Sequence, residues 1–165
     1  MRRKIKCEAV RIIQQAGFTL IELMVTVVII AIIAAVAYPS YTDYVVAARR
    51  ADGMSGLLRL AADLERYKGN CGQYTATIVG GIPTQPTCTG LGLLAGGDFS
   101  PDRHYLMAIA LIPDAATGAA IGYIITSTPQ AIQATRDTGC GALTYNHNGV
   151  KGVSGAKTVR ECWKQ

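Results

Sequence analysis

A chain of 165 residues with a formal net charge of +5 fits one globular domain with one appended segment. The positive charge is concentrated near the start, because residues 1–17 hold five basic residues against one acidic residue, a net charge of +4, so that only +1 remains for residues 18–165. This distribution excludes a uniformly basic domain of the kind that binds nucleic acid through its overall charge.

An apolar segment from Phe18 to Ala37 follows this basic leader. As a helix rising about 1.5 Å per residue, it covers about 30 Å, the thickness of the hydrocarbon core of a bilayer. The positive charge before it favours a cytoplasmic N-terminus and places residues 41–165 across the membrane. A cleaved secretory signal has a shorter apolar core of about 7 to 15 residues, although Ala34–Ala37 resembles its cleavage site. Cleavage after Gly17 fits this sequence better.

Glu22 is the one charged residue in the apolar segment. A carboxylate at the centre of a membrane helix costs about 2.5 to 3.5 kcal/mol even on the lower scales, so it is retained where a partner or a function requires it. Residues 18–37 contain no Lys, Arg or His, so its cation must come from a chain terminus or another molecule. We therefore expect an assembly; the alternative is a carboxylate tolerated near the membrane edge.

The helical pattern continues beyond the apolar segment. Pro39 removes a backbone donor and should kink or locally melt the helix. Residues 41–68 are amphipathic, because apolar residues recur on one face at helical spacing. These residues are Met54, Leu57, Ala61 and Leu64. Gly53 and Gly56 lower helix stability by about 1 kcal/mol each relative to Ala and indicate either flexibility or close packing.

Residues 69–102 are rich in Gly, Pro and Thr and predict a long surface loop, which in a compact domain is functional or held by another element. Cys7 lies in the leader. The remaining cysteines are Cys71, Cys88, Cys140 and Cys162. An even set in an exported domain indicates disulfides, here with three alternative pairings. Pairing Cys71 with Cys88 and Cys140 with Cys162 closes loops of modest length. The spacings do not match a zinc site, so no metal is expected.

Three apolar, partly alternating segments follow the loop and predict antiparallel strands. They are His104–Ile112, Gly122–Thr128 and Gly141–Asn146. Such a small sheet needs one covered face, and the amphipathic helix is the available partner. We therefore expect an α+β fold, a long N-terminal helix packed on a small antiparallel sheet within residues 103–147. Residues 148–165 are expected to form a loop-like tail, tied back by Cys162.

The segment Gly17-Phe-Thr-Leu-Ile-Glu22-Leu-Met, with the basic leader before it and Pro39 after it, resembles the N-terminus of type IV pilins. Further segments resemble the PilE-like branch of the class A pilins. They are Leu64–Tyr67, Cys140–Thr144, Gly149–Gly152 and Cys162–Trp163. The resemblance covers most of the chain and is weakest across residues 78–101. It implies the type IV pilin fold, in which an apolar helix half, here 18–40, protrudes from a globular head, here 41–165.

The resemblance also implies roles for matching residues. In these families a membrane-bound prepilin peptidase removes the leader, here residues 1–17, by cutting after Gly17, and methylates the new amine of Phe18. The matching glutamate pairs with the N-terminal amine of a neighbouring subunit during assembly, which supplies the cation that Glu22 lacks. Pro39 matches the family's helix-kink proline.

Cys140 with Cys162 matches the family's C-terminal disulfide loop, often called the D-region. The implied function is a structural subunit, a pilin or minor pilin, of a type IV pilus that serves adhesion, twitching motility or DNA uptake. The implied partners are other pilin subunits, the prepilin peptidase and methylase, the inner-membrane assembly platform and the inner membrane. The chain is expected as a single-pass inner-membrane protein with a periplasmic head, and after assembly in the extracellular pilus.

Nothing in the sequence indicates catalysis. His104 and His147 are the two histidines and are expected to be strand or turn residues, and no serine lies in a nucleophile motif. Asp98 and Asp102 carry oxygen atoms of the kind that bind calcium, but an ordinary polar turn explains them. We expect neither enzyme activity nor a cofactor.

Two alternative functions stay open. The first is a minor pilin at the pilus tip that binds DNA or a surface, because basic residues of the tail gather against a single acid, Glu161. These residues are Lys151, Lys157, Arg160 and Lys164. They would contact phosphates without sequence preference, whereas the ordinary interpretation is a solvated loop. The second alternative is a pseudopilin of type II secretion, which shares the N-terminal motif but typically lacks the C-terminal disulfide and its Cys-Trp ending.

Overall fold

The structure is a computed structural model in which residues 17–163 are described. Residues 1–16 of the predicted leader and Lys164 of the basic tail lie outside these residues. The chain divides into two compact units, one ending at Ser40 and one beginning at Tyr41. Helix α1 (Leu20–Cys71) contributes to both units. The other elements are β1 (Tyr105–Pro113), β2 (Ala120–Pro129), α2 (Ala131–Arg136), β3 (Leu143–Asn146), β4 (Lys151–Val153) and α3 (Val159–Trp163).

The first unit contains the apolar half of α1. Large apolar side chains are exposed along it, and α1 is the one helix among residues 17–163 that is long and apolar enough to cross a membrane. A helix that is apolar on all sides needs lipid or protein around it. The backbone stays helical at Pro39, so no turn is melted there in this structure, and the kink at Pro39 remains a prediction.

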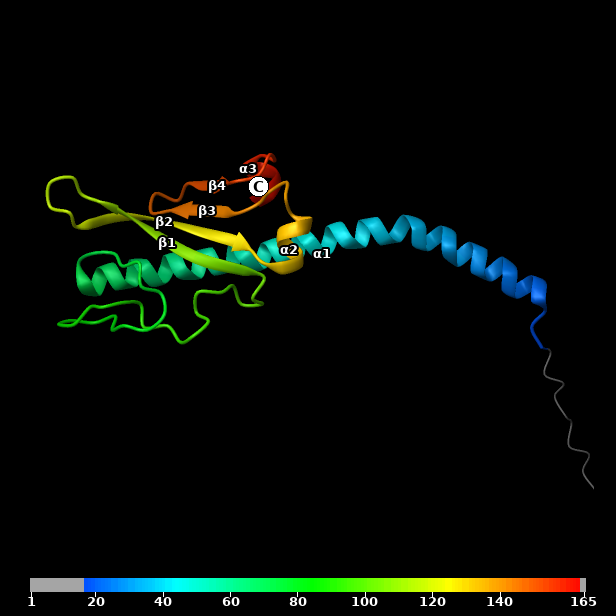
Figure 1. Cartoon of the computed structure of the whole chain (residues 1–165), viewed down its shortest axis with the longest axis horizontal. Coiled ribbons are helices and arrows are strands. Elements are labelled where there is room, and N and C mark those ends of the chain that lie inside the picture. Colours follow the sequence, from blue (N-terminus) through cyan, green and yellow to red (C-terminus); the bar gives the residue numbers. More distant parts are fainter. Residues whose placement is uncertain (1–16, 164–165) are drawn as a thin grey trace, which may run out of the picture. The chain divides into compact units, whose positions relative to one another are not determined.

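The second unit, which we call the head, combines the remainder of α1 with an antiparallel sheet. The strand order is β1-β2-β3-β4, and each strand pairs with the next one in the chain. The sheet runs along the head portion of α1 (Figure 1). This arrangement confirms the predicted α+β fold of the type IV pilins.

Three elements of the head depart from the sequence predictions. The tail at 148–165 is not a loop, because it forms β4 and α3, and the connection after β2 contains α2. The sheet therefore has four strands instead of three. Each missed element has six residues or fewer, which is too short for hydrophobic periodicity to register.

The core of the head forms where α1 meets the sheet. Leu57, Leu60 and Leu64 are fully buried, and complete burial of a leucine side chain stabilises a fold by about 1.5 to 3 kcal/mol. A Cβ atom at Gly53 would lie 2.8 Å from the ring of Tyr105. A Cβ atom at Gly56 would likewise clash with the side chain of Met107. Both glycines therefore serve close packing of β1 on α1, and not flexibility.

The long loop at 69–102 is held at both ends. A disulfide joins Cys71 at the end of α1 to Cys88, with 5.9 Å between their Cα atoms. At the other end, the buried carboxylate of Asp52 accepts hydrogen bonds from Ser100 Oγ and from the backbone N–H of Asp102, the latter at 2.9 Å. The loop is thereby fixed to α1, as its length had suggested.

Candidate functional site

The first candidate site is the N-terminus of α1. Gly17 to Thr19 precede the helix, and the backbone N–H of Glu22 donates to Thr19 Oγ1 at 3.3 Å. Thr19 and Glu22 have the Thr-x-x-Glu spacing of a capping box, with Glu22 in the first turn. The carboxylate therefore lies at the positive end of the helix dipole, close in sequence to the exposed Phe18. The Thr-x-x-Glu spacing is visible in the sequence, but the cap that Thr19 provides to the helix was not predicted from it.

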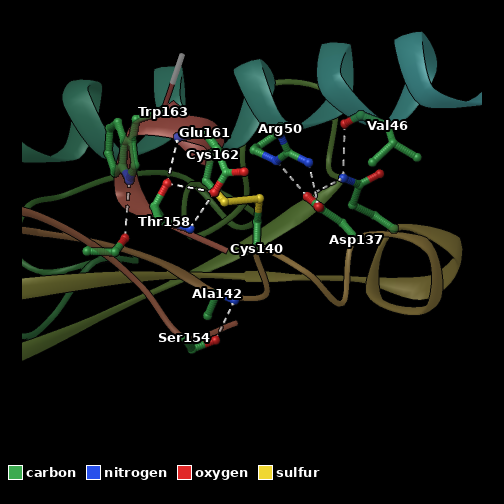
Figure 2. Close-up of a disulfide and its surroundings, with 12 residues drawn as sticks. Val46, Arg50, Asp137, Cys140, Ala142, Ser154, Thr158, Glu161, Cys162 and Trp163 are labelled. Atoms are coloured by element: carbon green, nitrogen blue, oxygen red, sulfur yellow. Dashed lines mark hydrogen bonds and ion pairs between the residues drawn. A yellow bond between two sulfur atoms is a disulfide. The ribbon is translucent and has the colours of Figure 1, made fainter. Parts of the chain in front are cut away.

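The second candidate site is the C-terminal disulfide loop. Cys140 and Cys162 are fully buried and disulfide-bonded, with 5.7 Å between their Cα atoms. The loop between them contains β3, β4 and most of α3, and Ser154 Oγ accepts from the N–H of Ala142 at 2.8 Å (Figure 2). At its end, the indole N–H of Trp163 donates to the carbonyl of Gly152 at 3.2 Å. The loop is a rigid platform.

A buried ion pair joins α1 to Asp137, the residue that follows α2 and precedes the disulfide loop. Arg50 Nε donates to Asp137 Oδ2 at 2.8 Å and Arg50 Nη2 donates to Asp137 Oδ1 at 2.5 Å (Figure 2). The carboxylate also accepts hydrogen bonds from the hydroxyl of Tyr105 at 3.1 Å and from Gln133 Nε2 at 3.1 Å. The hydrogen bond to Asp137 raises the pKa of Arg50, and burial raises the pKa of Tyr105. The Arg50 guanidinium therefore stays charged at physiological pH.

Sequence reasoning did not place Arg50 in the interior. It precedes Met54 by four residues and Leu57 by seven, which puts it on the apolar face of α1. A basic residue on an otherwise apolar helix face was the feature of the sequence that could have indicated a buried charge. Its partner Asp137 lies 87 residues away, and no local pattern identifies it.

The single acid of the tail caps a helix. Glu161 Oε2 accepts from the N–H of Thr158 at 2.8 Å and from its hydroxyl at 2.6 Å, while the N–H of Glu161 donates to Thr158 Oγ1 at 3.3 Å. These hydrogen bonds form a capping box at the start of α3 (Figure 2). The hydrogen bonds from Thr158 hold the pKa of Glu161 below its usual range.

Acidification should loosen α3 before it affects the rest of the head. Because the folded-state pKa of Glu161 is lowered, its stabilising contribution is present above the ordinary glutamate pKa and is lost as the pH falls through the lowered value. We expect hydrogen-exchange protection factors of the α3 amides to fall by about a few-fold over that range, because the helix loses part of its N-terminal cap. Glu161→Gln should remove the pH dependence; identical profiles in both proteins would contradict the assignment.

The predicted basic residues divide into two groups. Lys157 and Arg160 are exposed, whereas Lys151 is half-buried with its Nζ 5.1 Å from the ring centroid of Trp163. Lys157 also lines a pocket of about 480 Å³ together with Arg136 at the end of α2. Arg136 was not predicted at this site from the sequence, because its position beside Lys157 depends on how α2 packs.

The two predicted histidines lie at strand ends. His104 immediately precedes β1, and the N–H of His147, in the turn after β3, donates to the carbonyl of Tyr123 at 3.1 Å. His147 covers Gly122, where an added Cβ would approach its ring to 2.6 Å. Its position is that of a packed turn residue.

Comparison with known families gives two matches. Residues 39–144 match the model described as "Type IV minor pilin ComP, DNA uptake sequence receptor", which is well over half of the chain. Residues 13–38 match the prokaryotic N-terminal methylation motif and include Gly17, Phe18 and Glu22. No curated protein matches the chain in a sequence search. The first match ends before β4, so the basic residues of the tail lie beyond it.

Proposed function

Because the chain belongs to the ComP family of type IV minor pilins, we propose that it binds duplex DNA as a minor subunit of a type IV pilus. The family description names a receptor for DNA uptake sequences, so DNA uptake is favoured over adhesion and twitching motility. Membership of a minor-pilin family also favours this role over a major filament subunit and over a pseudopilin.

The observation that carries the DNA-binding proposal is the exposed positive charge of the disulfide loop. Lys157 and Arg160 project from the start of α3, and Arg136 shares the pocket of Lys157. Glu161, the one acid among the described residues of the tail, holds its carboxylate on the helix cap through two hydrogen bonds from Thr158, and the two exposed cations outnumber it. Basic side chains on a rigid platform are suited to displace the counterions of DNA phosphates.

The proposal includes the processing and assembly expected of a pilin. The leader is cut after Gly17 by a prepilin peptidase, which also methylates the amine of Phe18, and the apolar half of α1 anchors the subunit in the inner membrane. During assembly Glu22 pairs with the Phe18 amine of a neighbouring subunit, and the helix exchanges lipid for other helices. The methylation-motif match and the uniformly apolar helix support this sequence of events. The energy comes from separate motor proteins.

Removing two cations of the loop tests the DNA-binding proposal. Lys157→Ala with Arg160→Ala should weaken binding of a labelled duplex and lower the slope of log affinity against log salt by about 2, because each lost phosphate contact contributes about 1. Fluorescence anisotropy of the full chain in non-ionic detergent micelles, measured from about 50 to 200 mM salt, gives both quantities.

A matched pair of cations elsewhere on the head provides the control. Arg66→Ala with Lys68→Ala removes the same charge from α1, where Arg66 is paired with Asp63. We expect the control slope to change by less than half as much. Equal loss from both double variants, or no DNA binding by the unmodified chain, would count against the proposed surface and the proposed function respectively.

A further inference from the structure

Helix α2 has an inverted distribution of polar and apolar residues. Its buried positions are polar, since Gln133 is 1% exposed and Asp137, which follows the helix, is 3% exposed. Its outer surface carries Ile132, which is 56% exposed, together with small residues. A surface helix ordinarily buries its apolar side, so the informative features here are the buried polar groups and the exposed isoleucine.

The buried polar groups hold α2 in a fixed place. Gln133 Nε2 donates to the carbonyl of Val46 at 3.2 Å and to the hydroxyl of Tyr105 at 3.0 Å, which joins α2 to α1 and β1. At its start, the N–H of Gln130 donates to the carbonyl of His104 at 2.9 Å. These hydrogen bonds hold α2 on the head without burial of Ile132. The outer side of α2 is therefore accessible to another molecule.

Positive charge lies at the N-terminal end of α2. A pocket of about 200 Å³ is lined by Arg49, Arg103 and His104 and by residues 130–133, and none of its described lining residues is a carboxylate. Arg103 and Ala131 have positive φ angles of 60° and 47°, a left-handed conformation that is unfavourable for residues other than glycine. Both strained residues line this pocket together with Arg49, and strained backbone clusters at binding sites.

Positive charge also lies at the C-terminal end of α2. The pocket of about 480 Å³ there contains Arg136 and Lys157. Of its two acids, Asp137 is already paired with Arg50. Among the residues that line the pocket, Asp43 is then the one acid left to oppose Arg136 and Lys157, so the lining keeps a net charge of +1.

We propose that α2 is a DNA-contacting helix: its exposed side, with Ile132 and Thr135, lies in the major groove, and the cations at its two ends contact phosphates of opposite strands. This inference rests on the proposed function, which it deepens by naming the element that enters the duplex. It adds Arg49 and Arg103, which the tail does not include.

The dimensions favour this groove. The six residues of α2 span about 9 Å, and a helix is about 10 to 12 Å wide with its side chains. The major groove is about 12 Å wide, whereas the minor groove, at about 6 Å, does not admit a helix. An apolar side chain such as Ile132 contacts the methyl group of thymine there. An anionic membrane surface is disfavoured, because a helix with one large exposed apolar residue lacks the broad apolar face that lipid insertion requires.

Two matched pairs of variants test the inference in the full chain, in non-ionic detergent micelles with a labelled duplex of about 20 base pairs, two helical turns. Ile132→Glu should weaken DNA binding by about tenfold or more, since it sets a carboxylate against the groove, whereas Leu94→Glu should not. Leu94 is 87% exposed on the long loop.

Arg49→Gln with Arg103→Gln should lower the slope of log affinity against log salt by about 2. The control Arg66→Gln with Lys68→Gln should lower it by less than half of that. Thermal melts of all variants verify that each one is folded at the temperature of the binding measurement.

Each outcome is decisive. If the unmodified chain binds DNA and each α2 variant behaves like its control, the inference is overturned while the proposed function stands. If the unmodified chain does not bind DNA, both are overturned. If the variants leave DNA binding intact and the α2 amide resonances shift when phosphatidylglycerol is added to the micelles, α2 is a membrane-surface helix and the inference is overturned as well.

Discussion

Replacing Glu22 by Ala is expected to remove this chain from filaments while the head folds normally. Breaking one side of a desolvated ion pair costs about 3 to 5 kcal/mol, which corresponds to a loss of about 10²-fold to about 4 × 10³-fold in the affinity of one subunit for the next. The head has its own core and its own disulfides, so its melting temperature should not move. The measurement is mass spectrometry of sheared filaments, quantifying peptides that begin with N-methylated Phe18.

The capping box at the start of α1 calls for a second variant. Glu22→Gln keeps a side chain suited to the capping box with Thr19 but removes the charge, so it separates the two roles of Glu22. If pairing with a neighbouring amine is the essential role, Glu22→Gln should fail like Glu22→Ala, and Thr19→Ala should assemble. Filaments of normal content from Glu22→Gln would show that the cap, and not the ion pair, is what assembly requires.

Asp137→Ala is expected to have the largest effect on the stability of the head. The substitution leaves Arg50 buried without its carboxylate, which costs about 3 to 5 kcal/mol, and it also removes the acceptor of the Tyr105 and Gln133 hydrogen bonds. For a domain of this size, the melting temperature should fall by about 10 to 20 °C. Thermal unfolding of the full chain, followed by near-ultraviolet circular dichroism, measures the loss.

Two controls make this expectation specific to the buried pair. Asp63→Ala breaks an ion pair at the surface, because the side chain of its partner Arg66 is 67% exposed and that of Asp63 is 15% exposed, and it should cost about 1 kcal/mol or less. Arg50→Met combined with Asp137→Leu removes both charges and should recover part of the stability lost by Asp137→Ala. Equal melting temperatures for Asp137→Ala and Asp63→Ala would mean that the pair does not stabilise the head.

Elements with a long repeating pattern were predictable from the sequence. The apolar and amphipathic halves of α1 and the strands β1 and β2 each present a period that a window of residues reveals, the short β3 was found as part of the apolar segment Gly141–Asn146, and the motif around Gly17 and Glu22 is read directly. The short elements β4, α2 and α3 were missed, since three to six residues do not establish a period and depend on the contacts around them. The capping boxes of α1 and α3 were local signals that could have been used.

The sequence by itself determined the apolar anchor, the position of its lone carboxylate, the α+β class and an even set of cysteines in the head, because each is a property of neighbouring residues. Only the tertiary structure decided that Arg50 is buried against Asp137 and that Arg136 joins Lys157. It also decided that α2 turns its polar residues inward and Ile132 outward. These relations join segments far apart in the chain, and packing of α2 between α1 and the disulfide loop brings them within contact distance. A local pattern reports which face of an element is apolar, but the partner that covers that face is chosen by the fold.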